Sequence, residues 1–171
     1  MSIPDSAEFA RLFDADAYRI AWSYACRLCA GRADAEDLLQ ETLLMALGKL
    51  KQLRDPAAFR GWLLAIMRRR WLSERRKKLL TLEDSYAFQN LRAAQPAACP
   101  IELADALKRL PPRQREAIEL LYFSGLRVEE LAVVLAVTPH AASQLLGRAR
   151  QSLRRLLGPQ PAMTTCTEVQ Q

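Results

Sequence analysis

The residues most suited to chemistry in this sequence form a basic run, Arg68-Arg69-Arg70-Trp71-Leu72-Ser73-Glu74-Arg75-Arg76-Lys77-Lys78. Seven basic side chains against one acidic give this run a net charge of +6, which equals the charge of the whole 171-residue chain. Cations at that density repel one another unless anions neutralise them, and polyphosphate does so favourably because condensed counterions are released. The run therefore predicts nucleic-acid binding, with a merely solvated face as the alternative. Trp71 has two open interpretations: it stacks on an unpaired base, or it packs and anchors the helix end.

A second cluster is acidic and lies in the segment 33–48, which contains no basic residue. At about 100° per residue, Asp34, Asp37 and Glu41 fall within an arc of roughly 60° on one face of a helix. Two apolar residues, Leu44 and Met45, lie on or beside that face. Acidic residues stabilise helix N-termini, so a solvated face is one interpretation. We favour a protein-docking surface with an acidic rim and apolar contacts. This acidic face comprises Asp34, Asp37, Gln40, Glu41, Leu44 and Met45.

A third cluster lies near the C-terminus, where the spacing predicts a short helix over 128–135 and a long helix over 139–157. Between them, Thr138 is a suitable N-cap, and Pro139 suits the first helical turn. A short helix, a tight turn and a longer basic helix are typical of a helix-turn-helix. The apolar residues of the long helix are expected to face inward; they are Ala142, Leu146, Ala149, Leu153 and Leu156. The outward residues then face DNA, where Ser143 and Gln144 can read base edges and arginines can hold phosphates.

The sequence contains no pattern typical of catalysis, nucleotide binding or metal binding. The single histidine, His140, excludes metal sites that need two histidines, and the chain has no G-x-x-x-x-G-K-[ST], G-x-G-x-x-G or G-x-S-x-G motif. No residues therefore suggest an enzyme, and no cofactor is expected. Cys26 and Cys29 lie one turn apart, but a zinc site takes four ligands, and only Cys99 and Cys166 remain. We expect free, buried or semi-buried thiols and no metal.

The elements that position these clusters are helical. Apolar residues recur at helical spacing over 9–28, which predicts one helix ended by Gly31, and again over 35–50 and 59–67. The C-terminal block begins with expected helices over 101–110 and 113–123. No stretch alternates with a period of two over five or more residues, so no strands are expected.

Charge and proline content divide the chain into two basic blocks. Residues 1–78 carry net +5 and residues 101–157 net +3, whereas residues 79–100 carry net −1 and contain Pro96 and Pro100, which disfavour a continuous helix. We predict an all-α protein of two small helical domains, 1–78 and 101–157, with a flexible linker over 79–100 and a flexible tail over 158–171. Because no run of about 18 apolar residues and no signal peptide is visible, we expect a cytoplasmic protein without membrane insertion.

Five segments, in order, carry the pattern of one known family. Residues 35–42, Ala-Glu-Asp-Leu-Leu-Gln-Glu-Thr, are close to A-E-D-L-[VL]-Q-E-[TV], and residues 59–66 match F-R-x-W-L-x-x-I. Residues 110–116 match L-P-x-x-x-R-E, residues 125–132 resemble G-[LM]-S-[YV]-x-E-I-A, and Arg148-Ala149-Arg150 matches R-A-R. Over about residues 7–157, the chain resembles the small bacterial RNA polymerase sigma factors of the extracytoplasmic-function (ECF) group.

The resemblance implies a sigma domain 2-like bundle, then a sigma domain 4-like helix-turn-helix. The acidic face would bind the clamp helices of the polymerase's largest subunit, the linker would thread toward the RNA exit path, and the polymerase flap and an anti-sigma factor are further expected partners. Two sets of residues would contact promoter DNA. The −10 set is Arg60, Arg68, Arg69, Arg70, Trp71, Arg75, Arg76 and Lys77. The −35 set is Thr138, His140, Ser143, Gln144, Arg148 and Arg150.

The sequence also departs from the family pattern. Family members commonly carry Asn at the position of Arg69 and often Asp at that of Ser73. These departures affect the expected base preference at the −10 element and not phosphate binding. The usual G-T-V-[KR]-S-R becomes residues 140–145, where Ser143 and Leu145 replace two cations. We therefore expect weaker −35 binding, or reliance on shape and backbone contacts.

The leading hypothesis is a promoter-specificity factor. The alternatives are a sigma-like protein that sequesters an anti-sigma factor without promoter recognition, and a repressor that uses only its helix-turn-helix.

Overall fold

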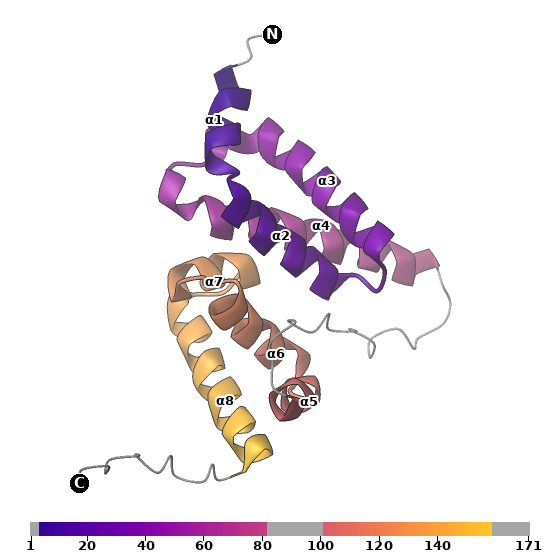
Figure 1. Ribbon diagram of the computed structural model, residues 1–171, viewed down its shortest axis with the longest axis vertical. Helices are drawn as coiled ribbons and strands as arrows, with labels where there is room; N and C mark the ends of the chain where they lie inside the picture. Colours follow the sequence, from indigo (N-terminus) through magenta and orange to yellow (C-terminus); the bar gives the residue numbers. More distant parts are fainter. Residues whose placement is uncertain (1–3, 82–100, 159–171) are drawn as a thin grey trace, which may run out of the picture.

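Figure 1 shows the computed structural model of the chain, which describes residues 4–81 and 101–158. All regular structure in these residues is helical, which confirms the predicted all-α fold. The first domain contains α1 (Pro4–Leu12), α2 (Ala15–Leu28), α3 (Arg32–Lys49) and α4 (Phe59–Thr81), with 3-10 turns at η1 (Leu50–Gln52) and η2 (Pro56–Ala58). The second contains α5 (Ile101–Arg109), α6 (Pro112–Ile118), the π-helical turn η3 (Glu119–Phe123), α7 (Val128–Leu135) and α8 (Pro139–Leu157).

The predicted linker and tail fall almost wholly outside the described residues. Helix α4 continues through Thr81, three residues beyond the predicted domain boundary at residue 78. Among the helices of the described ranges, none combines the length and apolarity that a membrane span requires.

The single helix predicted over 9–28 is wrong, because the chain breaks between α1 and α2. Asp14 is extended (φ −75°, ψ 178°), and its carboxylate accepts a hydrogen bond from the backbone N–H of Ala17 at 2.7 Å. An aspartate that caps the following helix in this way ends the preceding one. The apolar spacing concealed the break because Phe9 and Phe13 still stack, with ring centroids 5.8 Å apart, and Phe9 also packs edge-on against Phe59.

In the second domain, α7 and α8 have their predicted bounds. The Thr138 side chain accepts a hydrogen bond from the N–H of Ala141, which confirms the predicted N-cap, and Ala136 makes the turn in the left-handed region (φ 55°). The helix predicted over 113–123 begins at Pro112 and widens at its end, where the Ser124 N–H reaches back to the Glu119 carbonyl. The predicted inward face of α8 is confirmed, since Ala142, Leu146 and Ala149 are buried, while Leu153 and Leu156 pack partly buried against the core.

The two domains share one hydrophobic core, and α4 lies at its centre. Five consecutive residues, 63–67, are buried, which exceeds the stripe that a helix packed on one side would bury. Helices α2 and α3 pack against one side of α4, and α7 of the second domain packs against it as well (Figure 1). At Gly61 the approach is close, because a Cβ there would lie 2.8 Å from the Cβ of Glu130 on α7.

Candidate protein and nucleic-acid interfaces

The acidic face forms on α3 as predicted, with one residue turned inward. Asp34, Asp37, Gln40 and Glu41 are exposed, and the Leu44 side chain is 72% exposed. Met45 is half-buried and packs on the core, so it lies at the edge of the face. Leu47, 37% exposed and one turn beyond Leu44, adds apolar surface that the sequence analysis missed, although its helical spacing from Leu44 could have indicated it.

The acidic face is joined to the basic run by Arg70. Its Nε lies 2.8 Å from a carboxylate oxygen of Glu41 on α3, and its Nη1 contacts the carboxylate of Glu74 one turn along α4. Hydrogen bonds to Glu74 and Glu41 raise the pKa of Arg70. Carboxylates of the protein itself therefore neutralise part of the +6 charge of the basic run. Nucleic-acid phosphates are needed only for the rest.

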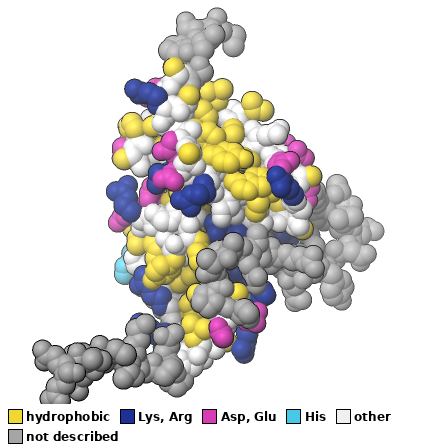
Figure 2. All heavy atoms as spheres, viewed as in Figure 1, with side chains coloured by type: hydrophobic (Ala, Val, Ile, Leu, Met, Phe, Trp, Pro, Cys, Tyr) yellow, Lys and Arg dark blue, Asp and Glu magenta, His cyan; other side chains and the backbone are white. Residues whose placement is uncertain are grey.

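The remaining side chains of the basic run differ in their exposure to solvent. The side chains of Arg69, Arg76 and Lys77 are exposed, while the Arg75 guanidinium lies over the Trp71 ring, 4.9 Å from its centroid. Trp71 is half-buried and packs against the core, which favours the anchoring interpretation over a freely stacking indole. On the face in Figure 2, Lys and Arg side chains of the first domain are interspersed with Asp and Glu.

Arg68, at the start of the run, binds the second domain. Its Nε and a terminal nitrogen donate to the two carboxylate oxygens of Glu116 on α6, at 2.8 and 3.2 Å. The buried hydroxyl of Tyr24 on α2 donates to the same carboxylate at 2.8 Å. Burial, followed by the nearby charge of Glu116, raises the pKa of Tyr24, which therefore stays a hydrogen-bond donor.

A second polar contact joins the domains beside the first. Arg27 on α2, only 6% exposed, donates to the Ser124 hydroxyl at 2.9 Å and lies 4.0 Å from a carboxylate oxygen of Glu119. Burial lowers the pKa of Arg27 and raises that of Glu119. The sequence analysis missed Tyr24, Arg27, Glu116 and Glu119, because no local pattern in the sequence pairs residues about 90 positions apart.

A cavity of about 470 Å³ lies between the domains at these contacts. Both domains contribute cations to its wall, which holds six arginines but only two carboxylates, Glu116 and Glu119. Trp71 and Leu72 give it an apolar side. The arginines are Arg27, Arg68, Arg75, Arg76, Arg113 and Arg115.

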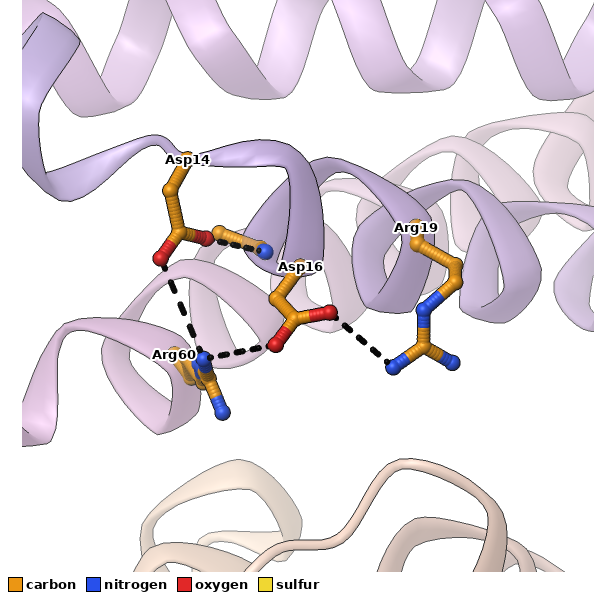
Figure 3. Close-up of polar contacts among 5 residues, drawn as sticks. Asp14, Asp16, Arg19 and Arg60 are labelled. Atoms are coloured by element: carbon orange, nitrogen blue, oxygen red, sulfur yellow. Dashed lines mark hydrogen bonds and ion pairs between the residues drawn. The ribbon is translucent and has the colours of Figure 1, made fainter.

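Arg60, which was grouped with the −10 set, lies apart from the basic run. It sits at the beginning of α4, roughly 12 Å along the helix from Arg68 at 1.5 Å per residue. Its guanidinium points to the carboxylates of Asp16 (3.6 Å) and Asp14 (4.0 Å) at the N-terminus of α2 (Figure 3). Asp16 also pairs with Arg19 at 3.3 Å.

The −35 set lies on the N-cap of α8 and on residues 140–150 of that helix. All six side chains are exposed. His140 hydrogen-bonds to Gln144 at 2.9 Å, so the two present one polar surface. Arg150 instead turns to Tyr122 on η3, to whose hydroxyl it donates at 3.0 Å while lying over the ring.

Cys26 and Cys29 are half-buried thiols outside any disulfide, as predicted, and burial raises the pKa of Cys26. Cys99 and Cys166 lie outside the described residues. Within the described ranges, no three His, Cys, Asp or Glu side chains are grouped as metal ligands would be.

Comparison with known proteins agrees with this geometry. Residues 15–79 match the family model for sigma-70 region 2, and residues 101–153 match that for sigma-70 region 4. The chain is 34% identical over 135 residues to the ECF RNA polymerase sigma factor EcfG of Rhodopseudomonas palustris (strain TIE-1), covering 75% of this chain and 74% of that protein. It is 31% identical over 131 residues to the ECF RNA polymerase sigma factor SigF of Caulobacter vibrioides (strain NA1000 / CB15N), covering 74% and 73%.

Among solved structures, the sigma factor RpoE of Bartonella quintana, in complex with the anti-sigma factor NepR, superposes with a TM-score of 0.65 at 26% identity. The match covers 88% of this chain and 96% of that one. The fold and the sequence together define a sigma-70 protein. More narrowly, the chain belongs to the ECF RNA polymerase sigma factors.

Proposed function

We propose that this sigma factor binds core RNA polymerase through α3 and directs it to promoters through α4 and α8. The observation that carries the proposal is the exposed acidic face of α3, where Leu44 lies in water beside Asp37 and Glu41. Leu47, one turn from Leu44, is also exposed, and adjoining apolar side chains beside a polar rim are typical of a protein-binding surface. Its expected partner is the pair of clamp helices of the polymerase's largest subunit, which would have to present cations to the rim.

The proposed DNA contacts divide between the two domains, with phosphate contacts on α4 and base contacts on α8. Arg69, Arg76 and Lys77 are exposed on α4 and are suited to phosphates of the −10 element, where contacts fix position. Ser143 and Gln144 on α8 are suited to base edges of the −35 element, with Arg148 on the backbone. The polymerase performs the chemistry, and this chain supplies binding and specificity.

An anti-sigma factor is the further partner that we propose, because the B. quintana relative is solved with one. A second candidate function follows from the same partner: the chain sequesters an anti-sigma factor without recognising promoters. The replacement of two customary cations of α8 by Ser143 and Leu145 favours this candidate. Core-dependent initiation by the purified protein separates the two, because only a promoter-specificity factor produces it.

The docking assignment is tested by charge reversal on α3. We expect Asp37→Lys with Glu41→Lys to abolish capture of core polymerase in a pull-down, because repulsion replaces attraction at the rim. Glu41 also pairs with Arg70, so Asp34→Lys with Asp37→Lys serves as a second variant that leaves that pair intact. Glu8→Lys, at an exposed position of α1, is the matched control. Unchanged core affinity in both double variants, with helical content preserved, would refute the assignment.

A further inference from the structure

The cavity between the domains has more positive charge in its walls than its own carboxylates balance. Its volume of about 470 Å³ lies within the roughly 300–1,000 Å³ that is usual for small-molecule sites. Helices α2 and α4 line one side of it, and α6 lines the other (Figure 1). Six lining arginines face two lining carboxylates, which leaves an excess of four positive charges. A cleft lined by one sign of charge concentrates ligands of the opposite sign.

The two carboxylates of the cavity are already engaged. Glu116 accepts two hydrogen bonds from Arg68, and Glu119 lies 4.0 Å from Arg27. Two further lining arginines, Arg76 on α4 and Arg113 on α6, are exposed, and neither forms an ion pair with any residue that the structure describes. These two guanidinium groups, one from each domain, are therefore able to bind an anionic ligand.

Buried nitrogens of the same wall lack hydrogen-bond partners. Arg27 is only 6% exposed, and within residues 4–81 and 101–158 nothing accepts a hydrogen bond from its Nε. The same holds for the buried Nε of Arg115. Both residues line the cavity. A buried donor without an acceptor is unfavourable, so a ligand rich in oxygen atoms would remove a cost that the protein otherwise bears.

The cavity also has an apolar part. Leu28 of α2, Trp71 and Leu72 of α4, and Pro112 of α6 line it. The Arg75 guanidinium lies over the Trp71 ring, 4.9 Å from its centroid, so two planar groups are stacked at the cavity. A nucleobase extends such a stack, because its flat face interacts favourably with guanidinium and aromatic planes alike. An aliphatic anion gains only the contact with the leucines.

We propose that this cavity binds a small molecule with several phosphates and a planar base, namely a nucleoside di- or triphosphate. The phosphates bind Arg76 and Arg113, and the base packs on Leu72 beside the stacked pair of Arg75 and Trp71. One ligand fills the cavity, so binding saturates at one molecule per chain. The site goes beyond the proposed function, since neither polymerase nor promoter DNA takes part in it.

The test is isothermal titration calorimetry of the full chain with ATP and with GTP, at about 150 mM salt to screen distant charges. Arg113→Ala removes a phosphate contact outside the proposed promoter-binding residues, and Arg109→Ala, at an exposed position of α5, is the control of equal charge. Leu72→Glu places a carboxylate in the cavity, and Val133→Glu, at an exposed apolar position of α7, is its control. Circular dichroism checks that all four variants keep their helices.

We expect one or both nucleotides to bind at one molecule per chain. Binding should be about tenfold weaker in Arg113→Ala, which loses a charged hydrogen bond, and undetectable in Leu72→Glu, while both controls bind as wild type does. Inorganic tripolyphosphate, which lacks the base, should bind about tenfold more weakly than the nucleotide. Absence of binding by both nucleotides overturns the proposal. Equal losses in Arg113→Ala and Arg109→Ala, or equal affinity for tripolyphosphate, also overturn it, because they indicate general attraction of anions to a basic chain.

Nucleic acid carries the same phosphates and bases, so a second measurement separates the two sources. Fluorescence anisotropy with a labelled single-stranded oligonucleotide measures DNA binding by Arg113→Ala and Arg109→Ala. We expect the two variants to have the same DNA affinity, because the cavity takes a single small molecule. A loss of DNA affinity in Arg113→Ala as large as its loss of nucleotide affinity would assign the cavity to DNA and overturn the proposal.

Discussion

The buried ion pair between Arg27 and Glu119 has poor geometry. It is buried with Glu119, yet its nearest approach to that carboxylate is 4.0 Å, and its Nε has no hydrogen-bond partner among the described residues. Removing two charges from water costs several kcal/mol, which only good geometry offsets. The contact is therefore retained at some cost to stability, while the loss of one partner alone would cost much more.

Replacing Arg27 by Met tests this balance. We expect the free energy of unfolding to fall by about 3 kcal/mol, because the buried Glu119 loses the larger of its two favourable charge interactions and keeps only that with Arg115. Urea denaturation measures the change. Burial already raises the pKa of Glu119, so its protonation favours the folded state, and acidification from neutral pH toward that raised pKa should reduce the deficit. Adding Glu119→Gln should recover most of the loss. A deficit that grows on acidification would contradict this assignment.

Residue-scale differences also separate the arginines of the basic run. We expect Arg76→Ala, at an exposed position, to lower DNA affinity and to reduce the slope of log K against log salt by about 0.7–0.9, the value for one phosphate contact. Arg70→Ala should change the slope less, because Glu41 and Glu74 already neutralise Arg70. Anisotropy titrations between 50 and 200 mM salt, the range over which phosphate contacts register, measure both slopes. Equal slopes for the two variants would show that the ion pairs of Arg70 with Glu41 and Glu74 do not reduce its contribution to DNA binding.

At the scale of elements, the boundary between α1 and α2 depends on one side chain. Asp14 caps α2 and so ends the helical pattern that runs through residues 9–28. We expect Asp14→Ala to lower stability by about 1 kcal/mol. Asp14→Asn should retain most of the stability, because the amide oxygen still accepts from Ala17 while the charge that faces Arg60 is lost. Thermal melts of the two variants separate the contribution of the cap hydrogen bond from that of the charge. Equal losses of stability would assign the effect to the ion pair with Arg60.

The sequence predicted elements well where local chemistry decides them. Thr138 and Pro139 determine the start of α8, and the apolar spacing of 128–135 determines α7, so both helices have their predicted bounds. The spacing over 9–28 failed because Phe9 and Phe13 stack across the break and keep the apolar period. The π-helical turn at η3, which contacts α6 and α7, was missed because no residue type in 119–123 distinguishes it from an ordinary helical turn.

At the scale of the whole molecule, the sequence predicted the separate surfaces but not their contact. The acidic face and the outward face of α8 are exposed, as amphipathic spacing predicts. Nothing in the local sequence indicates that Arg68 of the basic run binds Glu116, or that Gly61 allows α7 to pack on α4, because these pairs are set by the folded chain.

The central claim is that this ECF sigma factor directs polymerase to promoters, and the most direct measurement is reconstituted transcription. Core RNA polymerase, with and without the purified protein, is supplied with fragmented genomic DNA of the source organism, and the 5′ ends of the transcripts are sequenced. We predict discrete new start sites that need the protein, share two upstream motifs about 25 base pairs apart, and vanish with Asp37→Lys and Glu41→Lys. Capture of core polymerase without any new start site would contradict promoter recognition, and absence of core binding would contradict the whole assignment.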